Sequence, residues 1–234
     1  MSAVMSVLVE IIKSGECDRI ASVPNIGRLI DEPDDQLTPL LWSIILGNSL
    51  CAHELMRLGA DPSIGDEDGL TPLMYAAQNH DLEAVCALIA HGADVNSTSV
   101  DGLTCLMRAA AVGDGDIVKV ILEKGGDCHK ADGAGRTALH WSATEHDCPN
   151  VLKMLLQAGA PVDALTMPMG WSPLMYCSWL GREGMVRELL EFGANPAILS
   201  ADENKSAADL AREAGFVELS DSIIQYTDLS RGGD

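Results

Sequence analysis

Hydrophobic and polar residues follow one another along the chain in blocks that recur at a fixed interval. Each block has a polar turn, a Thr or Ser, a short apolar stretch, a polar break, a second apolar stretch and a glycine. The Thr or Ser that marks each block stands at Thr38, Thr71, Thr104, Thr137, Ser172 and Ser206, and the first three steps are 33 residues each. An interval of this size indicates a repeat protein, in which each block buries its apolar face against the next.

The block at residues 66–98 shows how one repeat is built. Thr71 is a natural N-cap and Pro72 a natural first helical residue, so a short helix is predicted to begin there. The polar residues 79–81 predict a loop, and apolar residues at helical spacing predict a second helix after it. Gly92 is predicted to end that helix in a left-handed conformation, which glycine adopts at little cost.

The motif Thr71-Pro72-Leu73-Met74-Tyr75-Ala76 resembles the Thr-Pro-Leu-His-x-Ala signature of the ankyrin repeat family. The chain departs from that signature in the His position, where only His140 keeps the family residue. The other repeats carry Leu41, Met74, Met107, Met175 and Asp209 there. The resemblance implies an all-α ankyrin repeat solenoid of helix-turn-helix units. It also implies first helices that line a concave face and β-hairpin fingers that project from it.

The repeat covers almost the whole chain, so we predict a single ankyrin repeat domain over residues 1–226. It would hold about seven units, including atypical units at the ends. Their approximate bounds are 1–32, 33–65, 66–98, 99–131, 132–166, 167–200 and 201–226. Residues 227–234 are predicted to be a frayed C-terminal tail.

The charge of the chain indicates which kinds of partner it can attract. Its net charge is −20, from 35 acidic and 15 basic residues. This balance argues against nucleic acid and against anionic membrane surfaces, because both attract Lys and Arg. It favours a partner with a basic segment, although acidic residues that serve only solubility remain an alternative. No apolar run has the roughly 18 residues that a membrane-spanning helix needs.

The cysteines bear on the compartment. Their number is seven, no two form a Cys-x-x-Cys pair, and they are scattered at about one per repeat. This pattern favours free thiols in a reducing compartment, so we expect a cytoplasmic protein, with the nucleus as a second location. Cys105 stands at a predicted helix start, where the helix dipole lowers a thiol pKa, and it is expected to react first.

The sequence contains only weak motifs for binding a nucleotide or a metal ion. Residues 133–136, Gly-Ala-Gly-Arg, superficially resemble a phosphate loop but lack the strand-to-helix context of one. The loop at 146–148 and the pair Cys128-His129 contain metal-ligand types without the spacing of a tetrahedral site. We therefore predict no cofactor and no metal, and keep a metal-dependent protein using the 146–148 loop as an alternative.

Catalytic residues are not predicted either. No nucleophile–base motif is present. The resemblance implies that His140, three residues after Thr137, makes a structural hydrogen bond at the helix start. Asn96 lies in a segment similar to one in which some ankyrin proteins are hydroxylated, but a turn-pinning role is favoured. The chain is therefore predicted not to be an enzyme.

The large aromatic residues fall at recurring positions relative to the Thr or Ser of each block. Four residues after it stand Trp42, Tyr75, Trp141 and Tyr176, and for the first three packing in the core is as good an explanation as binding. Trp171 stands one residue before Ser172, and Trp179 and Leu180 stand seven and eight after it. In the family these three positions usually face solvent. Exposed Trp is costly unless it meets a partner, so we predict an interface anchor here.

Trp171 and Trp179 are predicted to meet on one surface, with Tyr176 extending it, Met167 and Met169 at its rim, and Arg136 beside Trp171. The alternative is that both Trp fill a gap opened by one-residue insertions. The acidic turns of the early fingers are predicted to form an acidic rim. The full set of predicted partner-binding residues is Trp171, Trp179, Leu180, Tyr176, Met167, Met169, Arg136, Leu103, Leu70, Asp66, Glu67, Asp68, Asp34 and Asp35.

These observations predict a monomeric, non-catalytic protein–protein interaction module. It would bind its partner through the concave face and fingers, as an adaptor, inhibitor or assembly chaperone. The partner is expected to be a protein with a basic segment and an apolar anchor, not a nucleic acid or a membrane. A regulatory ankyrin fragment of a larger enzyme or channel is the other alternative.

Overall fold

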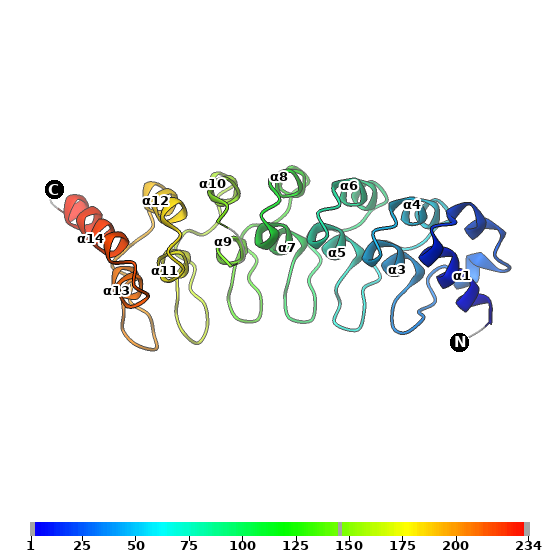
Figure 1. Cartoon of the computed structure of the whole chain (residues 1–234), viewed down its shortest axis with the longest axis horizontal. Helices are drawn as coiled ribbons and strands as arrows, with labels where there is room; N and C mark the ends of the chain where they lie inside the picture. Colours follow the sequence, from blue (N-terminus) through cyan, green and yellow to red (C-terminus); the bar gives the residue numbers. More distant parts are fainter. Residues whose placement is uncertain (1–2, 145–146, 232–234) are drawn as a thin grey trace. The chain divides into compact units, whose positions relative to one another are not determined.

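A computed structural model describes residues 3–144 and 147–231, and these form helices joined by turns (Figure 1). The helices are α1 (Ala3–Ser14), η1 (Cys17–Ser22), α2 (Ile26–Leu29), α3 (Pro39–Ile45), α4 (Ser49–Arg57), α5 (Pro72–Gln78), α6 (Leu82–Ala90), α7 (Cys105–Val112), α8 (Gly115–Glu123), α9 (Ala138–Ser142), α10 (Pro149–Gln157), α11 (Pro173–Trp179), α12 (Glu183–Glu191), α13 (Ala207–Glu213) and α14 (Val217–Arg231). The β-pairing in the described part of the chain is one isolated bridge between Asp34 and Leu37. The predicted all-α class is confirmed.

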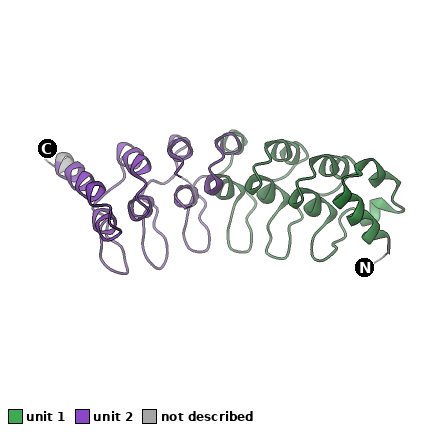
Figure 2. Ribbon diagram, viewed as in Figure 1, with its two compact units in different colours: residues 1–109, 119–126 green, residues 110–118, 127–234 purple. Residues whose placement is uncertain are grey.

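The chain forms two compact units, shown in different colours in Figure 2. Unit 1 comprises residues 1–109 and 119–126, and unit 2 comprises residues 110–118 and 127–234. The single domain over residues 1–226 stays a prediction. We expected a frayed tail from residue 227, but α14 continues as far as Arg231. Residues 232–234 lie outside the described part.

The first helix of each repeat begins where the Thr or Ser predicts it. The hydroxyl of Thr71 accepts a hydrogen bond from the Met74 N–H at 3.4 Å, and that of Ser172 accepts one from the Met175 N–H at 3.3 Å. A helix start leaves backbone N–H groups without intrahelical partners, and such a cap contributes about 1 kcal/mol. Pro72 and Pro173 follow these two caps at the first helical position, where a missing N–H costs nothing.

Small and branched side chains fill the space between successive helices. In unit 1, α5 packs against α3 and α6, and its Ala76 and Ala77 are fully buried. In unit 2, α11 packs against α9, α12 and α13, with Leu174 and Cys177 fully buried. Small residues let these helices approach closely, so a repeat hides its apolar face only when its neighbours are present.

The fingers are the loops that lead from a second helix to the next capping residue. Backbone hydrogen bonds close them, as from Asp66 N to Leu70 O at 3.1 Å or from Thr166 N to Trp171 O at 3.0 Å. A polar side chain reinforces the closure, since Asp66 Oδ1 accepts from Leu70 N at 2.8 Å. The expected β-hairpins are therefore tight turns without strand pairs in the described residues, apart from the isolated bridge at Asp34.

Neighbouring fingers within a unit touch through their backbones. In unit 2, the N–H of Met167 donates to the carbonyl of Ala134 at 2.7 Å, and that of Ala201 donates to Met169 at 2.8 Å. Gly135 has a φ of +76°, and a Cβ there would lie 2.9 Å from the carbonyl oxygen of Leu165. Only glycine satisfies both the left-handed backbone and the close approach at this turn.

The structure corrects the prediction that the cysteines are free thiols. Cys17 of η1 and Cys51 of α4 form a disulfide within unit 1, with their Cα atoms 4.8 Å apart. The two residues are 34 positions apart in different elements, so nothing local in the sequence pairs them. The disulfide also removes the argument for a reducing compartment, and localisation stays a prediction.

Candidate partner-binding site

Three aromatic side chains of unit 2 form a cluster, which we call the aromatic cluster: Trp171, Tyr176 and Trp179. Trp171 ends a finger just before the cap of α11, and the other two lie one helical turn apart on α11. The Trp171 ring centroid lies 5.3 Å from that of Tyr176 and 6.0 Å from that of Trp179. The predicted meeting of Trp171, Tyr176 and Trp179 is thus what the structure shows.

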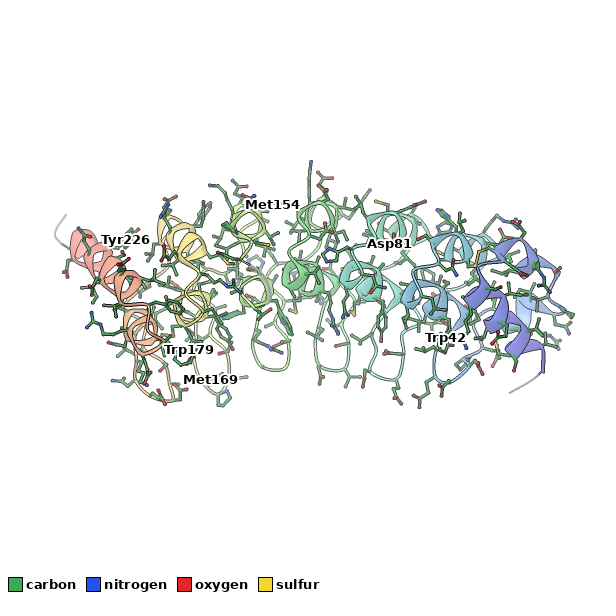
Figure 3. All side chains as sticks on the ribbon, in the orientation of Figure 1. Trp42, Asp81, Met154, Met169, Trp179 and Tyr226 are labelled. Atoms are coloured by element: carbon green, nitrogen blue, oxygen red, sulfur yellow. A yellow bond between two sulfur atoms is a disulfide. The ribbon has the colours of Figure 1, made fainter. Side chains whose placement is uncertain are left out.

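One side of the aromatic cluster faces solvent. Trp179 is 40% exposed and the adjoining Leu180 is 37% exposed, while Trp171 and Tyr176 are half-buried. Figure 3 labels Trp179 at the end of α11 and Met169 in the preceding finger. Met167 and Met169 are both exposed. Trp179 therefore does not fill an internal gap, which was the competing explanation for this residue.

A buried histidine supports the aromatic cluster from beneath. His140 Nδ1 accepts from the N–H of Thr137 at 3.1 Å, so Nε2 carries the proton and donates to the carbonyl oxygen of Trp171 at 3.2 Å. The imidazole edge meets Tyr176 at 5.4 Å. Burial lowers the pKa of His140 to about 4, so the ring is neutral at pH 7. The predicted hydrogen bond at the helix start is confirmed.

The next finger brings a carboxylate to Trp171. Ala201 packs against Gly170, and Asp202 follows it. The pKa of Asp202 is lowered, chiefly by a hydrogen bond from the Ser200 hydroxyl and in small part by the Trp171 side chain. Asp202 is exposed and anionic at neutral pH. The indole Nε1 of Trp171 is buried and has no hydrogen bond of normal geometry among the described residues, although it lies close enough to affect Asp202.

Lys205, the cationic residue nearest to Asp202 in sequence, is already paired with other carboxylates. Lys205 Nζ forms ion pairs with Glu203 and with Glu213, the latter at 2.6 Å. The hydrogen bonds to both carboxylates raise the pKa of Lys205. Asp202 thus keeps its negative charge next to the aromatic cluster.

Arg136 pairs with a carboxylate and stacks on an indole of its own repeat. Its Nε donates to Asp132 Oδ2 at 2.8 Å, and its guanidinium carbon lies 4.1 Å from the ring centroid of Trp141. Trp141 Nε1 donates to the same carboxylate oxygen at 3.1 Å. Arg136 therefore belongs to a stack with Trp141 and Asp132, and its predicted place beside Trp171 stays a prediction.

Two of the predicted acidic binding residues in unit 1 build their own fingers. Asp34 is buried and exchanges backbone hydrogen bonds with Leu37. Asp66 accepts from the Leu70 N–H with Oδ1 and from the Tyr75 hydroxyl with Oδ2 at 2.7 Å. Burial, and then Asp66, raise the pKa of Tyr75 to about 12. These two carboxylates do not offer free charge to a partner.

The exposed negative charge of these two fingers comes from Asp35, Glu67 and Asp68. Leu70 and Leu103 lie half-buried at finger bases. The acidic rim that we predicted in unit 1 is therefore reduced to three of its five carboxylates. It stays a candidate contact for a basic segment.

The remaining candidate sites have structural roles. The N–H₂ of Asn96 donates to the carbonyl of Gly125 at 2.9 Å, which pins its turn as predicted. Residues 133–136 form a finger turn rather than a phosphate loop. Cys128 Sγ donates to the carbonyl of Ala158 at 3.5 Å beside His129. Over residues 3–144 and 147–231, no group of three or more His, Cys, Asp or Glu side chains is placed to hold a metal ion, and His146 lies outside that range.

The prediction for Cys105 is wrong. Its side chain is buried and its Sγ donates to the carbonyl of Val95 at 3.2 Å. Burial raises its pKa to about 12, which outweighs the effect of the helix start. Cys86 is the exposed free thiol.

A family model described as "Ankyrin repeats (3 copies)" matches residues 3–99 and 106–200. None of the curated proteins compared with the chain matches it. None of the described helices combines the length and the apolar character that crossing a membrane requires.

Proposed function

The chain belongs to the ankyrin repeat family, whose members generally act as protein–protein interaction modules, and on that premise we propose that its unit 2 carries the main partner-binding surface. The surface comprises the aromatic cluster, Leu180 and the finger residues Met167 and Met169. The protein binds its partner without catalysis, as an adaptor, inhibitor or assembly chaperone. Each of these roles needs a recognition surface and no reacting group.

The observation that carries the proposal is the exposure of Trp179 and Leu180 side by side at the end of α11. Removing apolar surface from water contributes about 25 cal/mol for each Å² that is buried. A partner that covers these two exposed side chains would therefore gain binding free energy. Trp is also over-represented among interface residues whose truncation costs about 2 kcal/mol or more. Met167 and Met169 add flexible apolar side chains that adapt to a partner.

The fingers of unit 1 suggest a second contact of a different kind. Asp35, Glu67 and Asp68 are exposed, and the net charge of the chain is −20. A partner with a basic segment would associate faster with such a surface, because opposite charges steer the encounter. We therefore propose a partner that combines a basic segment with a residue that covers the aromatic cluster.

The test compares three forms of the protein as baits in a lysate of its source organism. The wild type, Trp179→Ala and Phe192→Ala are immobilised, and the retained proteins are identified by mass spectrometry. Phe192 is the matched control, because it is an aromatic residue at the end of α12 with 38% exposure. The proposal expects a protein that the wild type and Phe192→Ala retain and that Trp179→Ala loses.

The retained protein is then purified and its affinity is measured by calorimetry. Trp179→Ala should weaken binding by about 30-fold, which corresponds to about 2 kcal/mol. Equal affinities for wild type and Trp179→Ala, or an equal loss with Phe192→Ala, would contradict the proposed surface. Unfolding midpoints of the three forms show whether a loss of binding reflects a loss of fold.

A further inference from the structure

We propose that the aromatic cluster and Asp202 together form a binding site for one arginine side chain of the partner. The guanidinium would stack on the exposed indole face and pair with the Asp202 carboxylate. This inference rests on the proposed function, since it names the chemistry that the same surface recognises.

The chain itself shows how its indole rings are used elsewhere. In unit 1, Lys13 Nζ lies 5.2 Å from the ring centroid of Trp42. In unit 2, the Arg136 guanidinium lies 4.1 Å from the ring centroid of Trp141. In both cases a cation covers the negative face of an indole, which is a favourable electrostatic contact.

The Arg136 stack is a template for the proposed site. A single carboxylate, Asp132, accepts from both the guanidinium Nε at 2.8 Å and the indole Nε1 of Trp141 at 3.1 Å. A guanidinium, an indole and a carboxylate thus satisfy one another. At the aromatic cluster the indole is present as Trp171, and the hydrogen bond from Ala201 N to Met169 O at 2.8 Å brings the finger that carries Asp202 against it. Among the described residues no cation is stacked on either Trp there.

Burial by a purely apolar group would leave the negative charge of Asp202 without a cation. Asp202 would lose water and keep only the hydrogen bonds that it accepts from the Glu203 N–H at 2.8 Å and from the Ser200 hydroxyl. A buried charge without a partner is among the most costly features of an interface. A cation that pairs with Asp202 avoids that cost, and Lys205 does not supply it because Glu203 and Glu213 hold it.

The geometry favours arginine over lysine. The guanidinium is planar, so it lies flat on an indole while its N–H groups reach a carboxylate at the edge of the ring. It is also more weakly hydrated than an ammonium, so it loses less on contact with Trp179, Leu180 and Met169. The negative charge of the protein draws either cation toward it, and the flat aromatic surface selects between them.

The experiment follows the four indole N–H signals of the ¹⁵N-labelled protein by NMR. The probe is N-acetyl-arginine amide, compared with N-acetyl-lysine amide and with N-acetyl-citrulline amide, which has nearly the same shape without the charge. Signals are assigned with single Trp→Phe variants. The arginine probe should shift the Trp171 and Trp179 signals with a Kd on the order of 10 mM, and the other two probes should bind more weakly.

The matched variants are Asp202→Asn and Asp101→Asn, both at exposed finger carboxylates. Asp202→Asn should lower the affinity for the arginine probe by about threefold to tenfold, and Asp101→Asn should leave that affinity unchanged. The inference is overturned if citrulline shifts the two signals as much as arginine does. It is also overturned if Trp42 and Trp141 respond equally, or if Asp202→Asn binds arginine as the wild type does.

The probe experiment is independent of the partner. If arginine fails to bind selectively while Trp179→Ala still abolishes partner binding, this inference falls and the proposed function stands. If Trp179 does not matter for any partner, the proposed function fails whatever the arginine probe does.

Discussion

The imidazole Nε2–H of His140 donates to the carbonyl oxygen of Trp171 at 3.2 Å, which ties α9 to the base of the finger that carries the aromatic cluster. His140 is fully buried and is the one residue of the family type at its position in the repeats. Because Nδ1 accepts from the Thr137 N–H, one neutral imidazole satisfies both backbones. The support of the proposed binding surface therefore depends on an uncharged histidine.

This dependence predicts a loss of stability in acid. The pKa of His140 is about 4 in the folded protein and 6.5 for an ordinary histidine, so the unfolded chain binds the proton first. The stabilisation is complete above pH 6.5 and falls as the pH drops toward 4, by on the order of 3 kcal/mol. Urea unfolding at several pH values measures it.

The matched variant for this prediction is His140→Met, which installs the residue of Met74, Met107 and Met175. It lacks the titrating group, so its unfolding free energy should fall less between pH 6.5 and 4 than that of the wild type. Carboxylates contribute equally to both proteins and cancel in the comparison. Parallel pH curves would show that His140 does not control acid stability.

Core packing predicts a difference between two leucines of unit 1. Leu106 is 1% exposed on α7, so Leu106→Ala should lower the free energy of unfolding by about 2–5 kcal/mol. Leu122 on α8 is only half-buried, and Leu122→Ala should cost less. Chemical denaturation compares them, and an equal loss for the two variants would mean that their packing is not as described.

The acidic fingers separate into structural and exposed carboxylates. Asp66→Asn removes the charged acceptor of the Tyr75 hydroxyl and should cost about 1–2 kcal/mol of stability. Glu67→Gln with Asp68→Asn should leave stability within about 0.5 kcal/mol and lower the on-rate for the partner. Stopped-flow association at two salt concentrations measures the second effect. An on-rate that neither salt nor the double variant changes would return these residues to a solubilising role.

The thiols give a prediction that needs no partner. The structure has five free cysteines and one disulfide, so the unreduced, denatured protein should yield five reactive thiols and the reduced protein all seven. In the native protein a maleimide should label the exposed Cys86 first. Cys105 and Cys177 should resist it, because burial raises the pKa of each to about 12. Seven thiols without reduction would rule out the pair Cys17–Cys51.

The sequence by itself determined the repeat, the class of fold and the place where each first helix begins. Thr71, Ser172 and their equivalents recur because a helix start needs a hydroxyl acceptor, and that need is local. The meeting of Trp171 with Trp179 was also predictable, because a finger and the helix after it are joined by the chain. Periodicity and local chemistry are sufficient for such features.

Only the tertiary structure decided which of the predicted residues are available. Asp34, Asp66 and Arg136 look like free charges in the sequence, but Asp34 is buried, Asp66 accepts from the Tyr75 hydroxyl, and Arg136 pairs with Asp132. Cys105 stands at a helix start, but its pKa is raised to about 12, because burial disfavours the thiolate more than the helix start favours it. The disulfide and the contact between the fingers of Ala201 and Met169 join different elements of the fold. Burial and pairing depend on which side chains from other elements contact a residue, and the repeat pattern of the sequence does not specify those contacts.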